Sequence, residues 1–242
     1  MLAAWERAAP QPLWLIDPDR MPLEQYPAAA HAYIEAGGRW ALVGSSFLAR
    51  TSLHLWCQAA RKLSPLPLIL FPGSILQVSP EVDAILFLFL ASGRNPHYLI
   101  GGHVEVAPLL YQWGTEVIPT TYLLVGTDHT RSVHYITHSL PIPPDKPELV
   151  QATALAGLYL GQRVLYVDAG SGASVPPAPS VITALRQLTS VPIVVGGGIR
   201  DPETAASLWQ AGATFVVIGT ATEAKPFSRS DWETFFALCP SS

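Results

Sequence analysis

The chain has 242 residues, of which 49% are hydrophobic and 13% charged, and its formal net charge at pH 7 is −4. This composition predicts a single domain over residues 1–242 with a large buried core, and it argues against a disordered chain. The sequence contains no basic run, so we expect no nucleic-acid partner.

The longest strongly apolar run, Ala84–Ala91, is too short to span a bilayer. The N-terminal residues lack the basic and apolar regions of a secretion signal. Cys57 and Cys239 lie far apart without metal-ligand spacing, which is typical of thiols in a reducing compartment. We therefore expect a cytoplasmic protein.

Short apolar runs alternate with segments of helical spacing along the chain. The predicted strands are Leu13–Asp17, Trp40–Gly44, Leu66–Phe71, Ala84–Leu90, Glu116–Val125, Arg163–Asp168, Pro192–Val195 and Phe215–Ile218. The predicted helices are Glu24–Ala36, Ser52–Lys62, Tyr98–Tyr111, Leu149–Leu160, Ser180–Leu188, Thr204–Ala211 and Ser230–Leu238. This pattern predicts an α/β fold, a (βα)8 TIM barrel. An open doubly wound sheet is the alternative, but Asp17-Pro18-Asp19 stands where its glycine fingerprint would follow the first strand.

Two connections depart from the regular repeat. Pro72–Asp83 is short and rich in proline, glycine and serine, so we expect an irregular third βα connection that opens the ring of helices. Gly126–Asp145 is polar and contains prolines, which indicates either a functional loop or additional strand structure.

The last two predicted strands both end in glycine. Val191–Arg200 (VPIVVGGGIR) and Phe215–Thr220 (FVVIGT) are β-branched runs of the kind found in buried parallel strands. Asp201-Pro202-Glu203 then reads as a helix start, with Asp201 as the N-cap. Backbone N–H groups and the helix dipole favour an anion at such turns, and the pair matches the phosphate site after strands seven and eight of a β/α barrel. A tight turn without a ligand is the alternative.

Polar residues follow three other predicted strands. Strand one ends in Asp17 and strand two is followed by Ser45-Ser46, which together offer the oxygen ligands that Mg²⁺ prefers. A turn residue is the alternative for Asp17. Asp168-Ala169-Gly170-Ser171-Gly172 after strand six is either a second anion-binding turn or a flexible loop.

Other catalytic signatures are missing from the sequence. His129, His134 and His138 lie in one segment, but their spacing matches no zinc motif, so we expect no metal there. The sequence has no G-x-S-x-G elbow and no readable Cys/His pair, so nucleophilic catalysis is not indicated.

Taken together, these motifs resemble the geranylgeranylglyceryl phosphate synthase family, from about residue 13 to 223. The matching segments are Leu15–Asp19, Gly44–Ser46, Tyr166–Ala173, Gly196–Arg200 and Gly219-Thr220. Ser92–Gly101 and Lys146–Gly157 are similar to the family's second subgroup, which includes bacterial members. The family's enzymes transfer a prenyl chain to sn-glycerol 1-phosphate, forming an ether bond with its C3 hydroxyl.

The resemblance implies a role for each site. Asp17 and Ser46 would hold the Mg²⁺ that binds the diphosphate of a long-chain prenyl diphosphate, with geranylgeranyl diphosphate as the favoured donor. The glycerol phosphate would be cradled by Tyr166, Val167, Asp168, Ala169, Gly170, Ser171 and Gly172. Its phosphate would be held by Gly197, Gly198, Gly219 and Thr220. The prenyl chain would lie in a groove at the irregular third connection.

Four positions depart from the family pattern. Leu15 stands where the first subgroup has a lysine, Asp168 replaces the usual glutamate, Thr220 replaces an asparagine and Ser45 replaces a glycine. We assign Asp168 as the catalytic residue that orients or deprotonates the glycerol hydroxyl. The general base itself and the prenyl chain length stay open at this point.

Two other functions compete with prenyl transfer. One is a barrel isomerase or lyase acting on a phosphorylated small metabolite, with Asp17 and Asp168 as acid and base. The other is a non-catalytic phosphate-binding barrel. The resemblance further favours a homo-oligomer, with Trp56, Tyr98, Tyr111 and Trp113 either at the interface or in the core. An apolar substrate or product could bring the protein transiently to a membrane surface.

Overall fold

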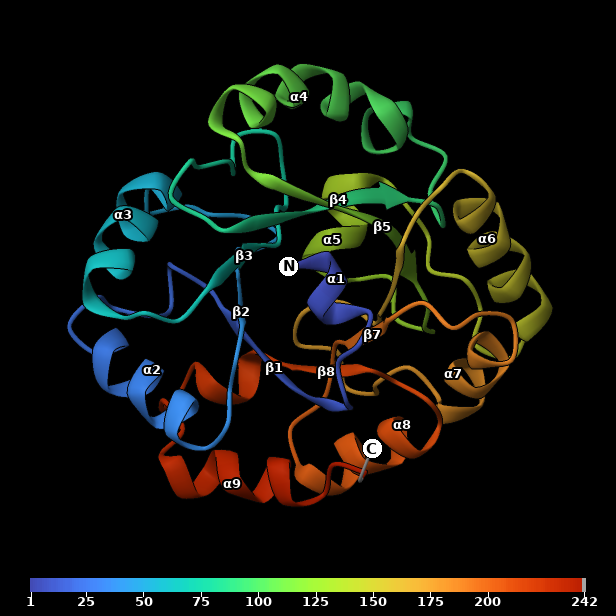
Figure 1. The fold of residues 1–242 in the computed structure, drawn as a ribbon. Coiled ribbons are helices and arrows are strands. Elements are labelled where there is room, and N and C mark those ends of the chain that lie inside the picture. Colours follow the sequence, from blue (N-terminus) through green and yellow to red (C-terminus); the bar gives the residue numbers. More distant parts are fainter. Residues whose placement is uncertain (241–242) are drawn as a thin grey trace.

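The computed structural model describes residues 1–240 and contains a closed barrel of parallel strands in the order β1 to β8 (Figure 1). The strands are β1 Gln11–Ile16, β2 Ala41–Val43, β3 Leu68–Leu70, β4 Ala84–Leu90, β5 Glu116–Leu124, β6 Val164–Asp168, β7 Ile193–Gly196 and β8 Phe215–Ile218. The prediction of a TIM barrel is confirmed.

Helices α2, α3, α4, α6, α7, α8 and α9 form a ring around the strands in Figure 1. Their bounds are α2 Tyr26–Glu35, α3 Leu53–Leu63, α4 Gly102–Trp113, α6 Pro147–Tyr159, α7 Pro179–Arg186, α8 Pro202–Gln210 and α9 Arg229–Ala237. Asp201 caps α8 as predicted, since its carboxylate accepts the Thr204 N–H at 2.7 Å. Within residues 1–240, no helix has the length and apolar character needed to cross a bilayer.

Buried side chains form two layers, because neighbouring residues of a strand point to opposite faces. One layer fills the inside of the barrel and includes Leu13, Leu42, Ile69 and Phe215. The other packs the outside of the strands against the helices. Chemistry is therefore confined to the ends of the barrel, where side chains and backbone reach solvent.

A short helix closes the N-terminal end of the barrel and was not predicted. Helix α1, Leu2–Trp5, lies across the centre of the barrel in Figure 1. Its Trp5 is fully buried, with its ring 4.6 Å from that of Phe215 and 6.4 Å from that of Trp40. The alanine-rich N-terminal sequence is too short to give a periodic signal.

The third connection is irregular, as predicted, and residues 71–83 contain no helix. The register between β3 and β4 ends at Leu70 opposite Ile85, whereas β4 continues to Leu90 and pairs only with β5. The C-terminal half of β4 therefore has no strand partner on the β3 side. This leaves a notch in the barrel wall that leads toward α4.

Two segments differ from the predicted elements. The polar stretch after β5 forms a short helix, α5 Ser132–Thr137, and a single bridge between Val125 and Ile142, so it is neither a plain loop nor an added strand. The predicted helix from Tyr98 begins as a π-helical turn, η1 His97–Gly101, before α4. A 3-10 turn, η2 Thr220–Thr222, follows β8.

Candidate active site

A cavity opens at the C-terminal ends of the strands and extends into the notch between β3 and β4. Among the predicted site residues, the following line it: Asp17, Ser46, Tyr166, Asp168, Ser171, Gly172, Gly197, Gly198, Gly219 and Thr220. Val167, Ala169 and Gly170 do not line it. Val167 packs instead in the outer layer, because it alternates with Tyr166 and Asp168 along β6.

The turn after β7 requires glycine for two reasons. Gly197 and Gly198 have φ angles of 85° and 75°, which disfavour any residue with a Cβ atom. A Cβ at Gly197 would also lie 2.7 Å from Asp168 Oδ1 and 2.9 Å from the Gly170 nitrogen. The turn after β7 thus packs backbone to backbone against the loop after β6, and both turns face one cavity.

The loop after β6 is shaped by its own aspartate. Asp168 Oδ1 accepts the Gly170 N–H at 2.8 Å, and Gly170 and Gly172 have φ angles of 90° and 70°. Arg131, just before α5, packs against this loop: a Cβ at Gly170 would lie 3.2 Å from its side chain. Arg131 also pairs with Asp128 at 2.5 Å. Sequence reasoning missed this arginine, which has no motif of its own.

Asp168 has a second partner that the sequence did not reveal. Tyr122 of β5 donates its hydroxyl to Asp168 Oδ2 at 2.5 Å. Burial raises the pKa of Asp168, while the hydrogen bonds from Tyr122 and Gly170 oppose that rise. Burial, followed by the Asp168 charge, raises the pKa of Tyr122 well above its ordinary value. Tyr122 is therefore the neutral donor and Asp168 the acceptor.

Three aromatic rings stand beside this carboxylate. Phe71 stacks on Tyr166 with ring centroids 4.7 Å apart, and Tyr122 contacts both at 5.9 Å and 5.4 Å. All three line the cavity. They form a cluster of packed aromatic rings within the cavity lining.

Oxygen atoms from the loops that follow the neighbouring strands β1 and β2 line the cavity. Asp17 and Ser46 line it together, and the Ser45 side chain hydrogen-bonds to Asp17. Asp19 joins the two loops by accepting the N–H groups of Ala49 and Thr51 at 2.7 and 2.8 Å. Burial raises the pKa of Asp17, while its hydrogen bonds with Ser45 and the Asp19 N–H and the charge of Arg20 oppose that rise.

The charged groups around the cavity test whether a divalent cation fits. Its lining includes the carboxylates of Asp17, Asp168 and Glu223, with Arg200 as the one arginine. Burial, and then repulsion from Asp17, raises the pKa of Glu223. Hard oxygen donors in a site of excess negative charge suit Mg²⁺, which also keeps substrate phosphate oxygens as ligands. Asp17 and Ser46 therefore fit the group that the sequence predicted for them.

Leu15 lies against Gly219 within the same cavity. Position 15 therefore presents an apolar side chain to the cavity. Arg200, which follows the β7 glycines, lines the cavity and donates to the Gly198 carbonyl at 3.3 Å. Arg200 ends a motif that was identified in the sequence and Glu223 follows another, but neither was assigned a role there.

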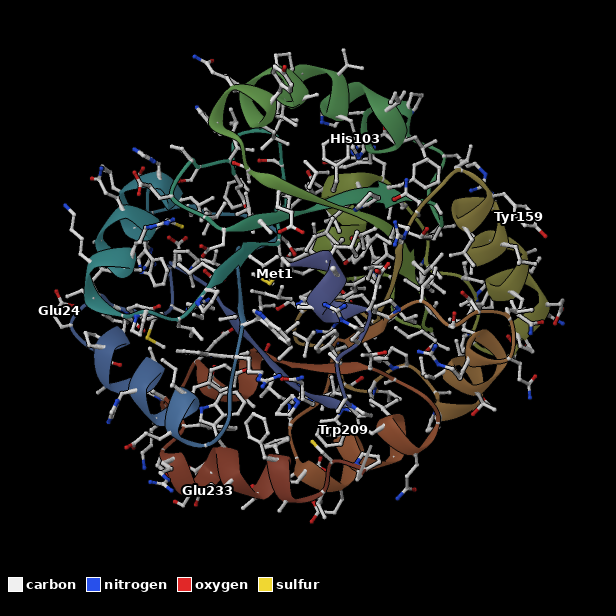
Figure 2. All side chains as sticks on the ribbon, in the orientation of Figure 1. Met1, Glu24, His103, Tyr159, Trp209 and Glu233 are labelled. Carbon is white, nitrogen blue, oxygen red and sulfur yellow. The ribbon has the colours of Figure 1, made fainter. Side chains whose placement is uncertain are left out.

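The part of the cavity that extends into the notch is apolar. Its lining includes Ile75, Val78, Ile85, Phe87 and Val106. Gln77 holds the adjoining loops together, since its Oε1 accepts the N–H groups of Gly73 and Ser45 at 3.1 and 3.4 Å. His103, labelled in Figure 2 between α4 and the strands, lines the groove and lies 4.3 Å from the Phe87 ring.

The fold and this cavity define a class: a TIM barrel with glycine turns at the C-terminal ends of its last strands and an apolar side groove. The chain belongs to the PcrB family, whose model matches residues 4–236. The resemblance seen in the motifs is confirmed, because similar proteins carry the family name that the motifs predicted.

The chain is similar to bacterial and archaeal relatives named geranylgeranylglyceryl phosphate synthase. One from Spirosoma linguale is 40% identical over 88% of this chain and 85% of the relative. One from Methanopyrus kandleri is 39% identical over 88% and 89%. The solved (S)-3-O-geranylgeranylglyceryl phosphate synthase of Thermoplasma acidophilum, in complex with its substrate sn-glycerol-1-phosphate, superposes with a TM-score of 0.90 at 31% identity, covering 98% of this chain and 96% of that one.

Proposed function

We propose that this protein is a prenyltransferase that joins sn-glycerol 1-phosphate to a long-chain prenyl diphosphate, with geranylgeranyl diphosphate as the favoured donor. The observation that carries the proposal is the position of Asp168. Its Oδ1 packs against Gly197 in the turn after β7, and its Oδ2 accepts the hydroxyl of Tyr122, whose ring belongs to the aromatic cluster of the same cavity. One cavity can therefore hold a small phosphoester and a hydrocarbon chain against the same side chain.

The glycerol phosphate binds at the ends of β6, β7 and β8. Its phosphate accepts backbone N–H groups at Gly197-Gly198, where both φ angles are positive, and at Gly219-Thr220, at the start of the 3-10 turn after β8. Arg200 adds positive charge at this end of the cavity. Tyr166 and the loop 168–172 enclose the glycerol part.

The prenyl diphosphate places its chain in the groove and its diphosphate at the mouth, near Asp17 and Ser46. These two residues would hold Mg²⁺, and a cation bound there would supply positive charge to offset the charge of the leaving diphosphate. The apolar lining along Ile85, Phe87 and Val106 accepts the hydrocarbon.

The reaction follows from this placement. The C3 hydroxyl of the glycerol phosphate attacks C1 of the prenyl chain while the bond from C1 to the diphosphate oxygen breaks. Asp168 accepts the hydroxyl proton, so an ether, a diphosphate and a protonated carboxyl result. Clamping the phosphate positions the hydroxyl, and such positioning supplies much of the rate acceleration.

A product assay tests the proposal directly. Prenyl diphosphates of increasing length are offered with each glycerol phosphate enantiomer, with and without Mg²⁺, and the ether product is measured by mass spectrometry. We expect product from the sn-1 enantiomer and a loss of about 10²- to 10⁴-fold in Asp168→Asn. The exposed Asp145→Asn is the matched control and should match wild type.

Specific outcomes would contradict the proposal. Full turnover by Asp168→Asn would remove the assigned base. Binding of glycerol phosphate without any product would favour the non-catalytic barrel. Conversion of a phosphorylated metabolite without a prenyl donor would favour the isomerase or lyase.

We also propose that the chain assembles as a homo-oligomer in the cytoplasm and touches membrane surfaces transiently through its apolar product. Of the four aromatics considered for an interface, Tyr111 is 91% exposed, whereas Trp56 is buried in the core. Tyr111 shares the outer side of the η1–α4 segment with exposed Ile100 and Val104. Analytical ultracentrifugation of wild type and Tyr111→Lys tests the assembly; a monomeric wild type would contradict it.

A further inference from the structure

Tyr122 is held in one orientation beside the reaction centre. It pairs with Leu90 of β4 on one side and Tyr166 of β6 on the other, so its backbone is fixed by two parallel neighbours. Its side chain is 6% exposed, and its ring contacts Phe71 and Tyr166. A buried ring packed on two others has little rotational freedom.

The hydrogen bond from the Tyr122 hydroxyl restricts the rotation of the Asp168 carboxylate group about its Cβ–Cγ bond. Oδ2 accepts Tyr122 and Oδ1 accepts the Gly170 N–H, so each oxygen has one donor. A carboxylate has about four acceptor positions in all. Each oxygen thus keeps capacity for one more donor, such as a substrate hydroxyl facing the cavity.

We propose that Tyr122 is a positioning residue, which orients Asp168 toward the acceptor hydroxyl and stabilises its ionised form. The inference rests on the proposed function and adds a residue to it. The side chain of aspartate is one methylene shorter than that of glutamate, so its carboxylate can reach fewer positions in the cavity. The Tyr122 hydroxyl sets its direction.

Electrostatics around the pair support this role. The titratable groups that face Asp168 are Tyr122 and Tyr166, both of whose pKa values are raised by burial and by the Asp168 charge. Neither competes for a proton near neutral pH. Burial raises the pKa of Asp168, and the hydrogen bond from Tyr122 opposes that rise because it favours the charged carboxylate. Loss of this hydrogen bond should therefore raise the pKa of Asp168 further.

Tyr122→Phe removes the hydroxyl and keeps the ring. We expect kcat to fall by about 10- to 100-fold, the range of a hydrogen bond to a charged group, with KM for glycerol phosphate changed by less than about threefold. The acid limb of the pH–rate profile should move to higher pH by about one unit. Tyr26→Phe is the control: Tyr26 is a fully buried tyrosine of α2 that packs on Trp14 and Trp56 outside the cavity.

A double-mutant cycle with Asp168→Asn separates this role from a contact with the prenyl chain. If Tyr122 acts through Asp168, the double variant should be no slower than Asp168→Asn alone. Multiplicative losses, or an unshifted acid limb in Tyr122→Phe, would overturn the inference. Wild-type rates in Tyr122→Phe with an inactive Asp168→Asn would overturn it while leaving the proposed function intact. Circular dichroism of each variant confirms that it has folded.

Discussion

The two sides of the cavity are built in opposite ways. On the β6–β8 side, closely packed backbone forms the surface, and glycines at φ 85° and 75° leave no room for other residues. On the β3–β5 side, side chains form the surface, and the space exists because residues 71–83 form no helix. In the proposed function, the first side would bind a phosphate with backbone groups and the second would accept a hydrocarbon without directional contacts.

This difference predicts that the two sides tolerate substitution differently. A substitution in the glycine turns should impair folding and catalysis together, because the turns pack directly on Asp168. A substitution in the groove should change which donor is used and leave the fold intact. Loss of the cation proposed at Asp17 and Ser46 should affect turnover without affecting either surface.

Removing the cation should have the largest effect of the three tests. We expect chelation, or Asp17→Asn, to reduce turnover by about 10²- to 10³-fold, since a Lewis acid at a leaving phosphate is worth several kcal/mol. Glycerol phosphate binding, measured by calorimetry, should persist, because its contacts lie on the β6–β8 side. Asp145→Asn serves again as the surface control. Unchanged turnover after chelation would exclude a metal-dependent reaction.

Gly197→Ala should have the next largest effect. Its Cβ would meet Asp168 Oδ1 at 2.7 Å, so we expect about 1–3 kcal/mol of overpacking beyond the cost of a positive φ, and at least about tenfold slower turnover. Gly114→Ala is the matched control: its φ is 68°, and a Cβ there would have no neighbour within 4 Å. Equal losses of unfolding free energy in the two variants, measured by urea denaturation, would refute close packing as the cause.

His103→Ala should have the smallest effect and change only donor choice. Burial lowers the pKa of His103, so a neutral imidazole faces the groove beside Phe87. Removing it enlarges the apolar space, and we expect the kcat/KM ratio of longer to shorter prenyl donors to rise several-fold, up to about tenfold. The exposed His31→Ala is the control. An unchanged ratio would place the end of the chain elsewhere.

The sequence predicted the barrel and the glycine side because their signals are local. Each strand is a short apolar run, and Val191–Arg200 carries strand, turn and helix start within one segment. The irregular third connection was likewise evident from the composition of Pro72–Asp83. The assignment of individual contacts to substrate stays a prediction, and Val167, Ala169 and Gly170 contribute no lining surface.

What the sequence did not predict depends on contacts between distant segments. Tyr122 lies 46 residues from Asp168 in the chain, inside an ordinary strand pattern, and only the register of β5 with β6 brings them together. Arg131 reaches the loop after β6 from a segment whose helix, α5, is too short to give a clear period. Helix α1, Leu2–Trp5, was missed because it is also too short to give a clear helical period.

A crystal structure with sn-glycerol 1-phosphate bound tests the central claim most directly. The account predicts the phosphate on the backbone of Gly197-Gly198 and Gly219-Thr220, with the C3 hydroxyl in hydrogen-bonding reach of Asp168. Density for the ligand elsewhere in the cavity, or a hydroxyl turned away from Asp168, would contradict it.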